Sequence, residues 1–471
     1  MPYFFEHQKK DYSSVGLSNN DGSITEFKKA LELLWKRRKS FGLTSVYFED
    51  ENNSEQQFFK FNLNTIQAGK YIGSIKFGEQ QFHVIPKIFQ DDHSKNEDHE
   101  YIEQSNRTIL WWLSKCTKID FPKSFSAWST QNFDFLDILI HLFASLTRDD
   151  LIFNQHQSYI EKEEEIQMLR GRIDFGKYST NFYTGKSHIL PCIYDTLEIN
   201  NLYNQIIKYT AKLLLQNTSN ESLKKTLFEI IWILDEVDDK YCSSNDCERV
   251  VVSPLNDNMQ TIVNYCKMFL SGMSVKSEKE DLEIFAFLIP TEKIFEDFLF
   301  GFIKDEFENK TGIINIMSQG NKFGEQKPLA EHIYNDGSLT KSFRLKPDIY
   351  IHKIDNDLIL DSKYKVIYTK EEANENDRSK SGVSISDVYQ MLAYTVKLDV
   401  KTCHLLYPPS LNTEIPLSGY YEIKHHNNLD RSKIYYHRLS TVITDTKSNL
   451  KELTKKQEDK LKGELKNIIC E

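Results

Sequence analysis

The chain has 471 residues, of which 39% are hydrophobic and 27% are charged. A chain of this length and composition is expected to form two or three globular domains, which excludes a disordered or repeat-rich protein. The formal net charge of −10 argues against a protein that holds nucleic acid over a generally basic surface, so any basic contact must be local.

The first 155 residues are predicted to form a mixed α/β domain. Apolar residues at helical spacing predict a helix over residues 24–39, with a basic C-terminal end. Short stretches of aromatic and β-branched residues predict strands at 45–48, 58–61, 71–77 and 82–89. The last two strands are expected to pair as a hairpin.

A charged loop is predicted from Gln90 to Gln104, followed by helices at 108–115 and 135–147. The first of these helices contains the pair Trp111-Trp112. Two adjacent tryptophans can pack in a core or form an exposed patch for a partner, and core packing is the favoured role.

Residues 156–280 are predicted to form a mostly helical middle region, because apolar residues recur at helical spacing. The predicted helices are 200–215, 223–237 and 261–270. Arg170 and Arg172 flank a glycine, and two guanidinium groups there could clamp a phosphate of DNA. An ion pair with the acidic run 161–165 or with Asp174 is the structural alternative, and the sequence leaves both open.

The cysteines and the apolar runs predict a cytoplasmic protein with reduced thiols. There are seven cysteines, an odd number, and the first residues show no signal-peptide pattern. No apolar run approaches the roughly 20 residues of a membrane span. Cys242 and Cys247 are the closest pair, but no second pair or histidine follows at zinc-finger spacing, so ordinary loop cysteines are favoured over a zinc site.

Near residue 281 the pattern changes to alternating strands and helices. Thr291 follows Pro290 and is expected to cap a helix whose apolar stripe begins at Ile294. Glu296 lies at the margin of that stripe. It could reach a site on the neighbouring strands, or it could be an ordinary solvated glutamate.

Two later segments, 346–351 and 359–363, are predicted to be strands. The turn-forming residues 355–357 lie between them, so we expect a hairpin that brings Asp348 close to Asp361. Because alternate side chains of a strand share a face, Asp361 and Lys363 project in the same direction.

Two carboxylates and a lysine at a strand edge supply what the hydrolysis of a phosphodiester needs. Carboxylate oxygens suit Mg²⁺, which keeps several positions for water and phosphate. The cation polarises the phosphoryl oxygen and lowers the pKa of a bound water, while Lys363 can hold that water or stabilise the developing charge. A bare Asp-x-Lys is usually a surface pattern, but the preceding Pro347-Asp348 and the flanking helices favour the catalytic interpretation.

Residues 385–396 predict a helix with Ser386 as its N-cap. Gln390 and Tyr394 are neighbours on its surface, where an amide and a phenol could orient a phosphate or the water shell of the metal. The remaining predicted elements are strands at 402–407, 419–424 and 433–439 and a charged helix at 446–466. This order predicts an α/β (α+β) fold with a mixed sheet flanked by helices.

In combination, these residues resemble the PD-(D/E)xK nuclease superfamily in the form that carries a Gln-x-x-x-Tyr helix. The surrounding sequence is similar to that of McrC, the nuclease subunit of the GTP-dependent McrBC restriction systems. The resemblance spans roughly residues 150 to 445. The matching segments are EKIFEDF at 292–298, KPDIYI at 346–351, LILDSKYK at 358–365, DVYQMLAY at 387–394 and LRGRIDF at 169–175.

The resemblance implies a PD-(D/E)xK nuclease domain over residues 281–471. Its Mg²⁺ ligands would be Asp348, Asp361 and Glu296, and Lys363 would be the catalytic lysine. Gln390 and Tyr394 would be secondary catalytic residues. The candidate DNA-binding residues are Arg170, Arg172, Arg344 and Lys346.

The resemblance also implies an endodeoxyribonuclease of the type IV-like restriction kind, which acts in phage defence on methylated double-stranded DNA. An McrB-like AAA+ GTPase would drive the cleavage, and residues 1–155 would engage its ring and stimulate its GTPase. The chain has no G-x-x-x-x-G-K-[ST] phosphate loop of its own, which agrees with a subunit that borrows its motor.

Two other functions remain open from the sequence. One is a stand-alone RecB-like DNA nuclease that cuts without a motor. The other is a non-catalytic adaptor whose nuclease fold only binds and stimulates an AAA+ ring, although the presence of Asp348, Asp361 and Lys363 argues against a decayed site.

Overall fold

The computed structural model shows a chain that divides into two compact units. The larger unit contains Met1–Lys39, Thr44–Leu136 and Val275–Glu471, so residues from both ends of the chain share it. The smaller unit contains Ser40–Leu43 and Asp137–Ser274. The structure describes residues 3–17, 22–40, 46–49, 51–78, 80–90, 98–119, 121, 135–154, 156–252, 257–270, 274–277, 280–318, 328–336, 338–367, 381–410, 417–424, 431–446 and 449–470.

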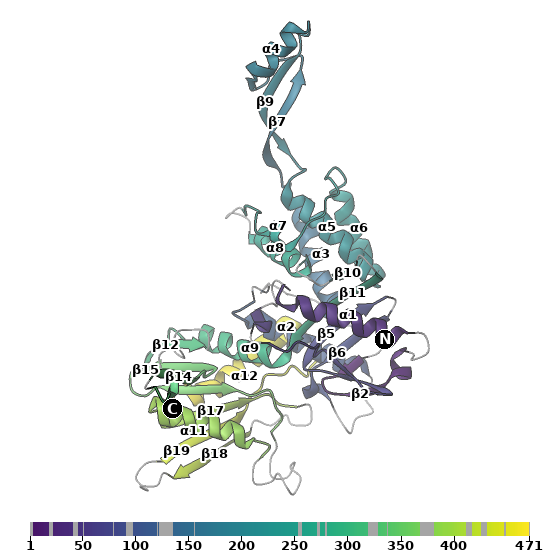
Figure 1. Ribbon diagram of the computed structural model, residues 1–471. Coiled ribbons are helices and arrows are strands. Elements are labelled where there is room, and N and C mark those ends of the chain that lie inside the picture. Colours follow the sequence, from purple (N-terminus) through teal and green to yellow (C-terminus); the bar gives the residue numbers. More distant parts are fainter. Residues whose placement is uncertain are drawn as a thin grey trace. The chain divides into compact units, whose positions relative to one another are not determined.

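The first part of the larger unit is built on a five-stranded sheet with the order β1-β6-β5-β11-β10 (Figure 1). Its strands are β1 (Tyr3–Phe5), β5 (Tyr71–Phe77), β6 (Gln80–Ile85), β10 (Ser274–Ser277) and β11 (Glu280–Pro290). β5 and β6 pair antiparallel, so the predicted hairpin is confirmed. β11 also pairs antiparallel with β5, which ties the start of the C-terminal segment into the N-terminal sheet.

Helix α1 (Ser23–Arg37) confirms the predicted N-terminal helix and buries one apolar face. Its Phe27 contacts Phe59 of a small sheet with the order β2-β4-β3. The strands of that sheet are β2 (Lys9–Asp11), β3 (Phe59–Phe61) and β4 (Thr65–Ala68). The strand predicted at 45–48 is wrong, because residues 46–48 form a 3₁₀ turn that buries both Tyr47 and Phe48.

Helices α2 (Asp98–Lys115) and α9 (Thr291–Phe307) pack against each other. Trp111 and Trp112 of α2 are fully buried, and both rings contact Phe298 of α9, so core packing is confirmed. The loop predicted to end at residue 104 is wrong from residue 98 onward, where α2 begins. Thr291 does not cap α9: Pro290 occupies the N-cap, and the Thr291 hydroxyl donates to Glu6 at 2.6 Å.

The second part of the larger unit is a six-stranded sheet with the order β12-β15-β16-β17-β19-β18. Its strands are β12 (Ile313–Ser318), β15 (Ile349–Lys353), β16 (Leu358–Ser362), β17 (Thr402–Tyr407), β18 (Leu417–Lys424) and β19 (Arg431–Arg438). β15 and β16 form the predicted antiparallel hairpin, whereas β16, β17 and β19 run parallel. The predicted mixed sheet is therefore confirmed. A separate hairpin is formed by β13 (Pro328–Ile333) and β14 (Leu339–Arg344).

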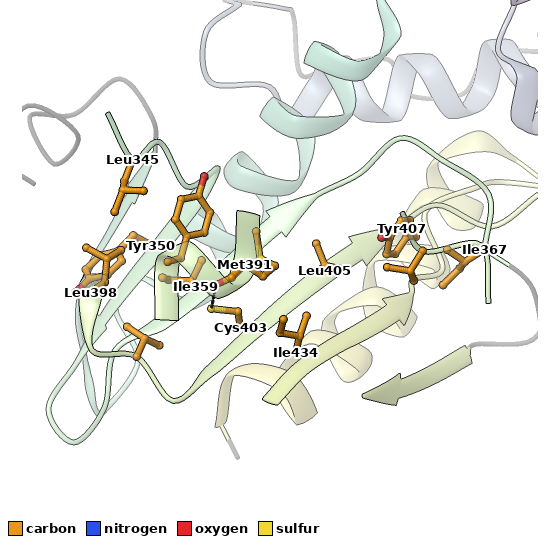
Figure 2. Packing of buried hydrophobic residues seen from close by; sticks show 13 residues of the cluster. Leu345, Tyr350, Ile359, Ile367, Met391, Leu398, Cys403, Leu405, Tyr407 and Ile434 are labelled. Carbon is orange, nitrogen blue, oxygen red and sulfur yellow. Dashed lines mark hydrogen bonds between the residues drawn. The ribbon is translucent and has the colours of Figure 1, made fainter. Parts of the chain in front are cut away.

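Helix α11 (Ile385–Leu398) covers one face of this sheet, and Figure 2 shows the buried side chains between them. Met391 of the helix meets Cys403 of β17, whose thiol donates to the Met391 carbonyl. The N-cap of α11 is Ser384 rather than the predicted Ser386, because the Ser384 hydroxyl accepts from the Asp387 amide at 3.2 Å. Helix α12 (Leu450–Cys470) completes the unit, and its leucines, such as Leu461, are buried.

The smaller unit combines a helical part with a three-stranded arm (Figure 1). The helices are α3 (Phe135–Phe153), α5 (Leu202–Asn217), α6 (Glu221–Ile233), α7 (Ser244–Cys247) and α8 (Asp257–Leu270). The arm, which we define as residues 158–198, contains β7 (Ser158–Ile166), β8 (Arg172–Ile173), α4 (Phe175–Tyr183) and β9 (Leu190–Glu198). Helices α3, α5, α6 and α8 overlap predicted helices, whereas α4, α7 and the strands of the arm were not predicted. Within the described ranges, no helix is long and apolar enough to cross a bilayer.

The contact between α2 and α9 generates a stability prediction. A Cβ atom at Gly301 of α9 would lie 1.8 Å from the Lys115 carbonyl oxygen at the end of α2. Gly301→Ala must therefore push the two helices apart, and we expect it to lower the free energy of unfolding by about 1–3 kcal/mol.

Urea denaturation of the whole chain measures this effect. Gly463→Ala in α12 is the matched control, since a Cβ there meets no atom within 4 Å. That change should leave the protein unchanged or more stable by up to about 1 kcal/mol, because alanine favours a helix. Equal stability of the two variants would contradict the close packing of α2 on α9.

Candidate active site

The β15–β16 hairpin brings two carboxylates together at one end of the six-stranded sheet. Ile349 pairs with Leu360, so Asp348 stands opposite Asp361. The backbone amide and the hydroxyl of Ser362 donate to Oδ2 of Asp348 at 2.9 and 2.7 Å, which fixes that carboxylate. Both aspartates are buried, and Asp361 is 0% exposed.

Lys363 completes this group from the end of β16. Its Nζ lies 2.5 Å from Oδ2 of Asp361 and donates to Oε1 of Gln390 at 3.1 Å. The Gln390 amide in turn donates to the Tyr394 hydroxyl at 2.8 Å. Gln390 therefore contacts the lysine directly, and Tyr394 supports Gln390.

Glu296 approaches the same group from α9 and is 8% exposed. Two lysines pair with its carboxylate: Lys293 Nζ lies 3.2 Å from Oε2, and Lys118 Nζ lies 3.7 Å from Oε1. Sequence reasoning missed Lys118, which follows α2 and is far from the motifs along the chain. No spacing rule links it to them, because its position depends on how α2 packs on α9.

Burial and mutual repulsion control the charges of these carboxylates. Burial, together with the neighbouring Asp348, raises the pKa of Asp361 to about 8, although Lys363 acts against this rise. Burial and the same aspartate also raise the pKa of Glu296. Burial disfavours the charged form of Lys363, but the adjacent Asp361 outweighs burial and raises the pKa of the ammonium. Such clustered, perturbed groups are typical of catalytic sites.

The carboxylates fit a hard divalent cation. Among the described residues, no three His, Cys, Asp or Glu side chains already form a metal-binding cluster. Magnesium, however, is usually held by only one or two carboxylates together with water and substrate phosphate. Oδ1 of Asp361 is buried without a hydrogen-bond partner, which is the kind of oxygen that a cation would satisfy. Asp348 and Asp361 would be its ligands, with Glu296 beside them.

The predicted DNA-binding residues are distributed over both units. Lys346 is exposed two residues before Asp348, whereas the side chain of Arg344 lies outside the described residues. Arg170 and Arg172 belong to the arm of the smaller unit.

The two arm arginines have contacts within the arm itself. The guanidinium of Arg170 lies 4.2 Å from the centre of the Tyr194 ring, and Arg172 lies 3.8 Å from Glu161. The second contact is the structural ion pair that the sequence left open. Gly171 between them has a φ of +64° and approaches the Ile193 carbonyl, so only glycine fits there.

The cysteine pair has a structural environment. Cys242 and Cys247 are buried at α7. Burial raises the pKa of the Cys247 thiol to about 12.

Comparisons with known proteins identify relatives of the chain. Residues 66–408 match the family model described as McrBC 5-methylcytosine restriction system component. A chain of the Thermococcus gammatolerans tetradecameric assembly of McrB AAA+ hexamers with bound McrC is similar over 99% of both chains, with a TM-score of 0.69 and 17% identity. A chain of the Thermococcus gammatolerans McrBC complex is similar over 66% of this chain and 89% of that one, with a TM-score of 0.50 and 17% identity. No curated protein sequence is similar enough to count as a match.

The raised pKa of Asp361 predicts how stability depends on pH. An aspartate has an ordinary pKa of 3.8, so between that value and about 8 the folded chain keeps a proton that the unfolded chain loses. The stability of the wild type should therefore fall over this range as pH rises. Asp361→Asn cannot ionise. Over the same pH range, we expect the free energy of unfolding of this variant to rise relative to that of the wild type by more than about 1 kcal/mol.

Chemical denaturation in EDTA, repeated between about pH 5 and about pH 8, measures the difference. Parallel stability curves for the two proteins would show that burial does not raise the pKa of Asp361.

Proposed function

The chain belongs to the family of McrBC 5-methylcytosine restriction system components, and we propose that it is the subunit that cleaves DNA. The observation that carries this proposal is the convergence of buried Asp348 and Asp361 on Lys363. The proposed reaction is Mg²⁺-dependent hydrolysis of phosphodiesters in methylated double-stranded DNA.

Each residue of the site has a role in this reaction. A divalent cation held by Asp348 and Asp361 would polarise the phosphoryl oxygen and supply an activated water. Lys363 holds an ammonium beside the reacting phosphate, where it stabilises negative charge that develops in the transition state. The hydrogen bonds of Gln390 and Tyr394 orient that ammonium before the substrate arrives.

The environment of the site supports this assignment of roles. The Ser362 contacts fix the carboxylate of Asp348, so its oxygens need little reorganisation. Burial raises the pKa of the Tyr394 phenol, which keeps it neutral and able to donate or accept a hydrogen bond. Preorganised charged groups in a water-poor site are stronger than the same groups in water.

We further propose that an McrB-like AAA+ GTPase drives the cleavage. The similar chain from the Thermococcus gammatolerans tetradecameric assembly comes from a complex of McrB AAA+ hexamers with bound McrC. The present sequence contains no nucleotide phosphate loop of its own, so a motor would have to be supplied by a partner.

Mutation of the catalytic aspartate tests the proposal. Asp361→Ala should reduce DNA cleavage, in the presence of the partner and GTP, by at least about 100-fold, because it removes a metal ligand and the partner of Lys363. Binding to the partner and stimulation of its GTPase should remain, since Asp361 is buried within one unit.

Asp355→Asn is the matched control, because Asp355 is an exposed carboxylate in the turn of the same hairpin. It should cut normally. Normal cutting by Asp361→Ala would refute the nuclease assignment, and an inert wild type that still stimulates the GTPase would support the adaptor instead. Cutting by the purified chain without partner or nucleotide would support the stand-alone nuclease.

A further inference from the structure

A buried carboxylate beside the site has no role in the chemistry described so far. Asp297 follows Glu296 on α9 and is 1% exposed. It accepts four hydrogen bonds: two from the amide and hydroxyl of Thr117, at 3.1 and 2.8 Å, one from the Lys118 amide at 3.0 Å and one from the Tyr47 hydroxyl at 2.8 Å. These bonds fasten the turn that carries Lys118 to the helix that carries Glu296.

The turn places an ammonium next to the catalytic carboxylates. Lys118 and Lys293 pair with the two oxygens of Glu296. Their side chains are 32% and 36% exposed, whereas that of Glu296 is 10% exposed. Both lysine side chains are therefore more accessible to a substrate than the carboxylate with which they pair.

We propose that Lys118 and Lys293 bind the DNA backbone beside the bond that is cut, and that Asp297 positions Lys118 for this contact. The proposal rests on the proposed nuclease function. A lysine ammonium is a compact charge on a flexible stem, which suits contact with phosphate oxygens. Phosphate contacts of this kind position a nucleic acid without reading its sequence.

The charges around the site explain why such lysines are needed. Asp348, Asp361 and Glu296 bring three carboxylates to one place, and a DNA phosphate adds more negative charge. Lys363 pairs with Asp361, and Lys118 and Lys293 add two further ammonium groups beside Glu296. The side chains of Lys118 and Lys293 are partly exposed, so their ammonium groups can leave Glu296 and bind a phosphate instead.

Equilibrium DNA binding tests the proposal. The full chain carrying Asp361→Asn, to prevent cutting, is titrated against a fluorescent DNA duplex at increasing salt. Lys118→Ala and Lys293→Ala should each weaken binding roughly three- to tenfold at low salt. Each should also lower the slope of log K against log salt by about 1, because one phosphate contact is lost.

Lys304→Ala is the matched control, since Lys304 lies on the same helix, is 41% exposed and pairs with Glu308. It should leave the slope unchanged, and Lys118→Arg should keep the wild-type slope because the charge remains. Asp297→Asn should weaken binding in the presence of Lys118 but not on top of Lys118→Ala, which separates positioning from general damage.

Slopes and affinities for Lys118→Ala and Lys293→Ala that equal those of Lys304→Ala would overturn the proposal. Cleavage by the chain without Asp361→Asn is measured in parallel. If that chain cuts DNA with its partner while both lysine variants bind normally, only the phosphate contact is wrong. If it never cuts, the nuclease function itself is wrong.

Discussion

The structure of the site depends on the burial of Asp361. An ionised carboxylate that is 0% exposed is costly, and two further carboxylates nearby add to the cost. The ammonium of Lys363 offsets part of this cost, and it is held by Gln390, which in turn donates to Tyr394. Removing one partner of such a buried pair is generally more damaging than replacing the whole pair, so these residues act as one unit.

The residues of the site are also supported by contacts from the N-terminal part of the chain. Glu6, at the end of β1, accepts from the hydroxyls of Thr291 and Tyr364, which begin α9 and follow Lys363 respectively. Asp297 makes the equivalent connection to the turn after α2. Both carboxylates are buried, and both join N-terminal segments to elements of the candidate site through several donors. The N-terminal part, which shares one compact unit with the C-terminal segment, therefore helps to hold the geometry of the site.

Local pattern was enough to predict some of this structure. The hairpin of Asp348 and Asp361 and the α11 pair of Gln390 and Tyr394 follow from strand alternation, turn residues and helical spacing. Lys118 and Asp297 did not follow, because their role depends on the packing of α2 on α9. The strands of the arm were missed for another reason: the run 158–166 is highly charged and largely exposed, so it lacks the buried face that identifies a strand.

The charge distribution connects the site to the need for a partner. The chain has a net charge of −10, and the described lysines nearest the catalytic carboxylates are already engaged by them. Little positive charge is then available to attract DNA from a distance, because association with DNA depends on the charge that a protein offers to phosphates. A nuclease with these properties would bind DNA only weakly by itself, so delivery of DNA into the site would bring its phosphates to these lysines more often. Such delivery is the task that a nucleotide-driven ring can perform, and the same weakness would protect unmodified DNA from the free subunit.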